Sequence, residues 1–399
     1  MRKNLIVSFF VLLVAVLVLS ACGPAATPET VTQIQTKIVE VTSTPGPAAP
    51  ATATPLPVGS VQITGSGATF PLPLYSQWTY AYQFVDPSVV INYTGVGSGA
   101  GKTAIIAGTV DFAGSDSLLS DQQYTDGKDL QMYPMVAGAV VPVYNIAFKP
   151  VPTPEAGKTA ITLPKLILDR QTLVDIYNGK VTKWNDPKIV ALNPGLVDYL
   201  PDAAITTVHR SDGSGTTEIF TKALTSFSPD WTAGGASSVE WPGQGLGGKG
   251  NAGVAAQVIA NPNSIGYVEL AYALSNGMSV AQMVNKAGQT VTANGASVEA
   301  AMAEFAGAFT DKLTATIVDG SSAGAWPITG YTYIILHTTS LTDCVKAQKL
   351  LEFLKWAQTD PAAQSGATTL GYSVLPDAVR QTVLAKLGEV TCNGQPVLP

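Results

Sequence analysis

From residue 60 onward, short apolar runs alternate with segments of helical length, and this rhythm restricts the possible folds more than any other feature of the chain. The strands predicted from the first apolar runs are 60–64, 89–93, 110–113 and 139–148. The helices predicted between them are 74–84, 102–107 and 118–124. This βαβ order predicts an α/β fold with a mostly parallel sheet and helices on its faces.

The second part of the chain continues the alternation. The elements predicted there are a helix at 168–177, a strand at 205–209, a helix after Ser214, a helix at 252–260, and strands at 265–268 and 331–337. A further helix is predicted at 344–359, because apolar residues recur on one helical face and Asp343 precedes them as a cap. The glycine-rich segment 243–250 predicts a loop.

The chain begins with the pattern of an export signal. A basic start at 1–3 precedes an uncharged apolar stretch at 5–19, which is shorter than the roughly 20 residues of a spanning helix. The segment 19–23 resembles a bacterial lipobox. We therefore predict a signal peptide at 1–21 and a lipid on the Cys22 thiol, which would anchor the protein to a membrane. A plain signal peptide with an incidental cysteine is the alternative.

The segment that follows the leader is rich in Pro, Thr and Ala and has few charges. It predicts an extended tether at 22–59 that holds a globular body away from the membrane. About 340 residues remain, enough for two domains with cores of their own. The formal net charge is −6, and loss of Arg2 and Lys3 with the leader makes it −8, so nucleic acid is not an expected partner.

Two further cysteines, Cys344 and Cys392, form an even pair in a chain expected to be exported. We predict a disulfide between them, with two buried free thiols as the alternative. The chain has only two histidines and no cysteine cluster, so neither a metal site nor a cofactor is expected.

The segment 209–218, His-Arg-Ser-Asp-Gly-Ser-Gly-Thr-Thr-Glu, has the composition of an oxyanion site. The Arg210 guanidinium matches the geometry of phosphate or carboxylate. Glycines at 213 and 215 permit a tight turn ahead of a helix, so that the N–H groups of Ser214, Gly215 and Thr216 point at a negative charge. An ordinary turn is the alternative, in which Asp212 closes an Asx-turn and Ser214 or Thr216 caps the helix.

Three other stretches share this character and also follow predicted strands: 65–71, 95–101 and 111–116. Together with 209–218 they should meet at carboxyl ends of strands, where ligands bind in open α/β sheets. Gly101-Lys102-Thr103 imitates a nucleotide-binding loop, but Val96 stands where that loop needs glycine.

Nothing in the sequence indicates an enzyme. Gly320-Ser321-Ser322-Ala323-Gly324 matches the nucleophile-elbow pattern, but Pro327 opposes the helix that must follow an elbow. No nucleophile with a base and no set of metal ligands is visible.

Several segments in matching order resemble the extracytoplasmic phosphate-binding proteins of high-affinity phosphate ABC importers. They are 67–71, 92–99, 111–116, 210–216, 247–251, 264–267 and 326–329, and the similarity runs from about residue 64 to 387. The resemblance implies a type II periplasmic-binding-protein fold, with two α/β lobes and a ligand cleft between them. The chain would form lobe 1 from 60–138 and 326–399 and lobe 2 from 139–325, with hinges near Gly138 and Ala325.

The resemblance also implies which residues bind phosphate. They are Thr69, Phe70, Ser98, Asp116, Arg210, Ser214, Gly215 and Thr216, with Asp212 orienting Arg210. Asp116 would accept a hydrogen bond from a protonated phosphate oxygen and reject sulfate, which has no proton to donate. His209 replaces a second basic residue that some members carry ahead of the arginine.

The function implied is binding of inorganic phosphate outside the cytoplasmic membrane and its delivery to the permease subunits of an ABC importer. The protein would be a monomer, lipid-anchored to the cell membrane. Two alternatives are a binding protein for another oxyanion, such as sulfate or molybdate, and an extracellular phosphatase.

Overall fold

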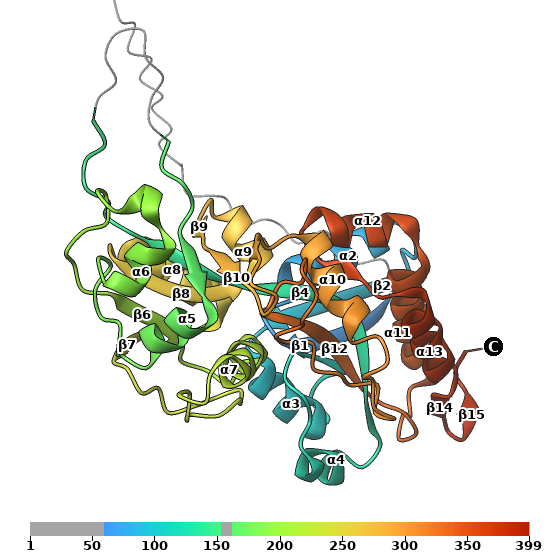
Figure 1. Ribbon diagram of the computed structural model, residues 1–399. Helices are drawn as coiled ribbons and strands as arrows, with labels where there is room; N and C mark the ends of the chain where they lie inside the picture. Colours follow the sequence, from blue (N-terminus) through green and yellow to red (C-terminus); the bar gives the residue numbers. More distant parts are fainter. Residues whose placement is uncertain (1–59, 153–161, 399) are drawn as a thin grey trace, which may run out of the picture. The chain divides into compact units, whose positions relative to one another are not determined.

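The computed structural model describes residues 60–152 and 162–398 (Figure 1). The predicted signal peptide at 1–21, the tether at 22–59 and the lipidated Cys22 lie outside the described residues. Within the described part, no helix has the length and apolar character needed to cross a membrane.

One sheet runs through the described body in the order β2-β1-β3-β12-β4-β8-β6-β7. Its strands are β1 (Val61–Gly67), β2 (Val89–Gly95), β3 (Phe112–Ser115), β4 (Leu130–Asn145), β6 (Thr206–Arg210), β7 (Gly245–Gly248), β8 (Ser264–Glu269) and β12 (Thr329–His337), while β9 (Ser279–Val280) and β13 (Ser373–Val374) also pair with β4. The long strand β4 pairs with β12 through Leu130–Ala139 and with β8 through Val140–Asn145. We call the strands β2, β1, β3 and β12 the β1 half, and β8, β6 and β7 the β6 half.

The prediction of a mostly parallel sheet is wrong at the centre. Strand β1 is parallel to β2 and β3, and β6 is parallel to β7 and β8. The connecting strands β4 and β12 are instead antiparallel to each other, and each is also antiparallel to its outer neighbour. The local βαβ rhythm describes each half and contains no information on how the halves join.

Two predicted boundaries in the sheet are also wrong. Strand β4 begins at Leu130, not at 139, because Pro134 and Gly138, which normally mark turns, lie inside it. A register irregularity opposite Pro134 accommodates the missing N–H. The predicted loop at 243–250 contains the edge strand β7, whose Gly245 approaches Thr207 so closely that a Cβ would lie 2.6 Å from the Thr207 hydroxyl.

Helices follow the carboxyl ends of the parallel strands, as predicted. Helices α2 (Leu72–Tyr82), α3 (Ser98–Ile106), α7 (Gly215–Phe227) and α8 (Gly250–Ala260) follow β1, β2, β6 and β7. Helix α11 (Cys344–Thr359) has the predicted bounds, its cap Asp343 accepts from Lys346 N at 3.0 Å, and its predicted apolar face is buried. The remaining elements are α4 (Asp121–Gly127), β5 (Ile167–Asp169), α5 (Arg170–Tyr177), α6 (Pro187–Leu192), the 3₁₀ helix η1 (Pro194–Leu196), α9 (Leu270–Ser275), β10 (Gln282–Val284), β11 (Thr290–Val291), α10 (Gly295–Glu304), α12 (Pro361–Thr369), α13 (Asp377–Gly388), β14 (Thr391–Cys392) and β15 (Gln395–Pro396).

The predicted disulfide between Cys344 and Cys392 is present, with an S–S distance of 1.99 Å. It joins the first residue of α11 to β14.

Replacing both cysteines by serine is expected to lower the free energy of unfolding by about 4 kcal/mol, because the bond constrains a long loop in the unfolded chain. The two cysteines are 48 residues apart. Urea unfolding measures the effect, and reduced wild-type protein should match the double variant. A loss under about 1 kcal/mol would contradict the loop-closure argument.

Candidate functional site

Thr69 lies in the turn between β1 and α2, and Asn251 of α8 holds its hydroxyl. Thr69 Oγ1 accepts from Asn251 N at 3.0 Å and from Asn251 Nδ2 at 2.9 Å. The turn needs glycine at position 67, because φ is +144° there and the Cβ of any other residue would lie 2.1 Å from Gly114 O. The backbone N–H of Phe70, the next residue, has no acceptor among the described residues. It is therefore a donor available to a ligand.

Ser98, the first residue of α3, joins the two halves of the sheet at the site. Its Oγ accepts from Asp116 N at 3.3 Å within the β1 half and from Gly215 N at 3.1 Å across to the β6 half. A second bond between the halves runs from Gly99 N to Gly213 O at 3.0 Å. Glycine is required at position 215, because the Cβ of any other residue would lie 2.5 Å from Ser117 N.

Arg210 ends β6 and forms a two-pronged ion pair with Asp212. Its Nε and Nη2 donate to the two carboxylate oxygens at 2.8 and 2.7 Å, and the Arg210 side chain is 1% exposed. Burial acts to raise the pKa of Asp212, but the hydrogen bonds and charge of Arg210 outweigh it and hold that pKa below its usual value. Asp212 therefore stays ionised and fixes the guanidinium, whose Nη1 points to Thr216 Oγ1 at 3.4 Å.

The Asp116 carboxyl lies just past the end of β3 and is 5% exposed. Its Oδ1 accepts from Thr332 Oγ1 at 2.8 Å, whereas no described residue donates to Oδ2. Burial raises the pKa of Asp116 to about 7, against the lowering effects of Thr332 and Arg210. One oxygen of this carboxyl is therefore fixed by the protein and the other is available.

The first turn of α7 fits the helix-cap interpretation of the 209–218 segment but only part of the oxyanion interpretation. The N–H groups of Ser214 and Gly215, which were also expected to point at an anion, donate instead to Ser237 O and Ser98 Oγ. Ser214 is the helix cap, since its Oγ accepts from Thr217 N at 3.1 Å, and its own N–H donates to Ser237 O at 2.9 Å. The N–H of Thr216 has no acceptor among the described residues, and the Thr216 hydroxyl accepts from Asn251 Nδ2 at 3.1 Å. Thr216 N–H thus joins Phe70 N–H as a donor at a positive helix end.

A family model described as "PBP superfamily domain" matches residues 30–361. "Phosphate-binding protein PstS" of Xylella fastidiosa is 41% identical over 319 residues, which cover 79% of this chain and 82% of that protein. The protein of the same description from Pasteurella multocida is 40% identical over 327 residues, 81% of this chain and 89% of that protein. The chain belongs to the PstS phosphate-binding protein family.

A solved structure described as a phosphate-binding protein from Stenotrophomonas maltophilia shares the fold. It aligns with a TM-score of 0.60 and 21% identity over 85% of this chain and 100% of that chain. The predicted fold class is confirmed: two α/β lobes with a ligand cleft between them.

The structure brings all the predicted site residues of this PstS family member together. Ser98 contacts Asp116 and Gly215, and Asn251 links Thr69 to Thr216 and so to Arg210.

Three residues that hold the site were missed from the sequence. Asn251 is the last residue of segment 247–251, which is one of the segments that resemble the phosphate-binding family, so the sequence contained a signal for it. Thr332 lies 216 residues from Asp116, and Tyr272, whose hydroxyl donates to Thr69 O at 2.6 Å, lies 203 residues from Thr69. Neither has a local sequence signal.

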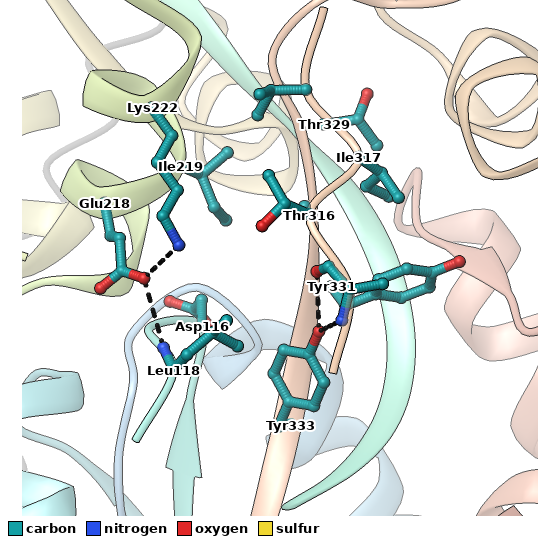
Figure 2. A pocket seen from close by; sticks show the side chains of 13 residues that line it. Asp116, Leu118, Glu218, Ile219, Lys222, Thr316, Ile317, Thr329, Tyr331 and Tyr333 are labelled. Atoms are coloured by element: carbon teal, nitrogen blue, oxygen red, sulfur yellow. Dashed lines mark hydrogen bonds and ion pairs between the residues drawn. The ribbon is translucent and has the colours of Figure 1, made fainter. Parts of the chain in front are cut away.

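Behind Asp116 lies a small cavity of about 20 Å³, the size of one water molecule (Figure 2). Glu218 lies on its wall, where Oε1 accepts from Leu118 N at 3.3 Å and from Lys222 Nζ at 2.7 Å. The bond to Leu118 joins α7 to the segment that follows β3.

In residues 60–152 and 162–398, no three His, Cys, Asp or Glu side chains cluster in a way that could hold a metal ion.

Proposed function

We propose that this chain binds inorganic phosphate outside the cytoplasmic membrane and delivers it to the permease subunits of an ABC importer. The observation that supports it most is the set of donors around Asp116. The N–H groups of Phe70 and Thr216 have no acceptor within residues 60–152 and 162–398, and Asp212 fixes the guanidinium of Arg210. Donors alone would accept any oxyanion. Asp116 Oδ2 adds a hydrogen-bond acceptor to this set of donors. Only an anion that carries a proton can donate a hydrogen bond to it.

This proton requirement separates phosphate from sulfate. Phosphate at neutral pH keeps at least one proton, which Asp116 Oδ2 accepts, whereas a sulfate oxygen would face the carboxylate without a hydrogen between them. Burial raises the pKa of Asp116 to about 7, so the ionised, acceptor-only carboxylate that this discrimination requires becomes the main form as pH rises above that value. Charge-assisted hydrogen bonds contribute about 1.5 to 3 kcal/mol each, so several of them reach the roughly −8 kcal/mol of micromolar binding without a metal.

We infer that lobe 1 comprises 60–138 and 326–399 and lobe 2 comprises 139–325. Strand β4 supports this division, because its pairing changes from β12 to β8 between Ala139 and Val140. Gly138 pairs with Gly330 of β12 at this point, and the two glycines suit a hinge there. The chain would pass between the two lobes a second time near Ala325. In this two-lobe arrangement, the hydrogen bonds that join Ser98 to Gly215 and Gly99 to Gly213 would form when the lobes close on the ligand.

The proposed location rests on the N-terminal pattern. Signal peptide 1–21, lipid attachment at Cys22 and tether 22–59 would place the monomeric binding body outside the cell membrane. A substrate-binding role of this kind requires no catalytic group.

Calorimetric titration of the mature chain tests the function. We expect one phosphate site with micromolar or tighter affinity, no measurable heat with sulfate or molybdate, and no change after treatment with EDTA. Tighter binding of sulfate or molybdate would replace the proposal with the other oxyanion. Hydrolysis of p-nitrophenyl phosphate would favour the phosphatase instead.

A further inference from the structure

Glu269 is a fully buried acid that has no part in the phosphate-binding mechanism described above. It ends β8 and caps α9, with Oε2 accepting from Ala271 N at 2.9 Å, and it is 0% exposed. Its Oε1 has no hydrogen-bond partner among the described residues. An ionised carboxylate in this position would be costly, because burial without a counter-charge disfavours the charged form.

The Tyr372 hydroxyl has two hydrogen-bond partners but only one hydrogen. The Tyr372 hydroxyl is 2.7 Å from Phe70 O and 3.0 Å from Glu269 Oε2. A carbonyl oxygen only accepts, so the single hydroxyl hydrogen of Tyr372 belongs to the shorter bond to Phe70. With that hydrogen on the Phe70 side, a hydrogen bond between Tyr372 and Glu269 requires that the glutamic acid carries the proton and donates it to the Tyr372 oxygen.

Glu269 also controls the other side of the site through its backbone. Its N–H donates to Asn251 Oδ1 at 2.9 Å, which directs Asn251 Nδ2 towards Thr69 Oγ1 and Thr216 Oγ1. One residue therefore holds the carbonyl of Phe70 through Tyr372 and the hydroxyls of Thr69 and Thr216 through Asn251.

We propose that Glu269 is a neutral carboxylic acid that acts as a positioning residue for the Thr69–Phe70 turn of the phosphate site. The inference rests on the proposed function for its effect on phosphate. Ionisation of Glu269 would draw the Tyr372 hydrogen away from Phe70 O and add a negative charge behind the anion. Phosphate affinity then falls on the alkaline side.

The ionisable groups that act on Glu269 come from three segments: Asp116 after β3, Tyr272 on α9 and Tyr372 before β13. None of these three side chains is a cation. Burial raises the pKa of Glu269 to about 8, and the charge of Asp116 adds to that rise. The acid is therefore mostly neutral at pH 7 and ionised by pH 9.5.

The test compares phosphate affinity of the mature wild type and Glu269→Gln from pH 6 to 9.5 by calorimetry. Glutamine is a neutral mimic of the acid. The proton equilibria of free phosphate are common to both proteins and cancel in the ratio of their dissociation constants. We expect the wild-type Kd to rise about tenfold more than that of the variant between pH 7 and 9.5. Exposed Glu299→Gln on α10 is the control and should follow the wild type.

Infrared spectroscopy supplies a readout that needs no substitution at Glu269. In Asp116→Asn protein, which lacks the other acid of raised pKa at the site, we expect the carbonyl band of an un-ionised carboxylic acid at pH 7 and its loss by pH 9.5. Absence of that band, or a Kd ratio that is constant with pH, would overturn the inference. Wild-type protein that binds no phosphate at any pH would overturn the proposed function instead, while the infrared result would still decide the state of Glu269.

Discussion

Asp116→Asn is expected to reduce the preference for phosphate over sulfate by roughly 10³-fold or more. The Thr332 hydroxyl donates to Asp116 Oδ1, so the amide oxygen of the variant takes that bond. The amide nitrogen then replaces Oδ2 as a donor facing the anion. A proton on the ligand is no longer required, and sulfate should gain affinity while phosphate loses some.

Competitive titration of phosphate against sulfate measures this change. Asp126→Asn, an exposed residue of α4, removes the same charge away from the site and should leave the preference unchanged. A variant at position 116 that keeps the wild-type preference would contradict the role of this carboxyl in proton recognition.

Asp116→Asn should also change how stability depends on pH. The pKa of Asp116 is about 7 in the folded protein and takes its ordinary value of 3.8 in the unfolded chain, so the native state keeps a proton that the unfolded chain loses between these values. The unfolded state binds fewer protons there, so the free energy of unfolding of the ligand-free wild type falls as pH rises from about 4 to 7. The variant should lack this part of the decline in urea unfolding.

Arg210→Ala is expected to weaken phosphate binding by roughly 10²- to 10⁴-fold, and to weaken arsenate by a similar factor. Asp212 occupies Nε and one hydrogen of Nη2, and Thr216 Oγ1 accepts one hydrogen of Nη1, which leaves one hydrogen on each of Nη1 and Nη2 for the anion. Loss of two charge-assisted bonds costs about 3 to 6 kcal/mol. The Asp212 carboxylate, left without its partner, would also repel the ligand.

Arg210→Lys is the matched variant for geometry, since it keeps the charge but not the planar fork that pairs with both Asp212 oxygens. It should fall between the wild type and Arg210→Ala. Arg380→Ala on α13 removes a positive charge elsewhere and should bind phosphate normally. A phosphate dissociation constant of Arg210→Ala equal to that of the wild type would exclude the guanidinium from the site.

Features that depend on one segment of the chain could be predicted from the sequence, and features that depend on pairing between distant segments could not. Helix α11 and its cap were predicted to the residue, because the cap and the apolar face lie within one segment. The start of strand β4 was predicted nine residues too late, because Pro134 and Gly138 resemble turn residues and are tolerated only through pairing with β12. The antiparallel centre of the sheet depends on β4 and β12, which lie about 200 residues apart and share no local pattern.

The amino-acid sequence by itself determined the chemistry of the candidate site: the Arg210–Asp212 pair two residues apart, the Ser214 cap, and glycines where side chains would collide. Only the tertiary structure decided the state of its two acids. Asp116 acquires Thr332, and Glu269 acquires Tyr372 and the Phe70 carbonyl beyond it, from segments 216 and 103 residues away. Burial and the supply of hydrogen-bond partners set the protonation of a carboxyl group, and both arise only when distant strands pair.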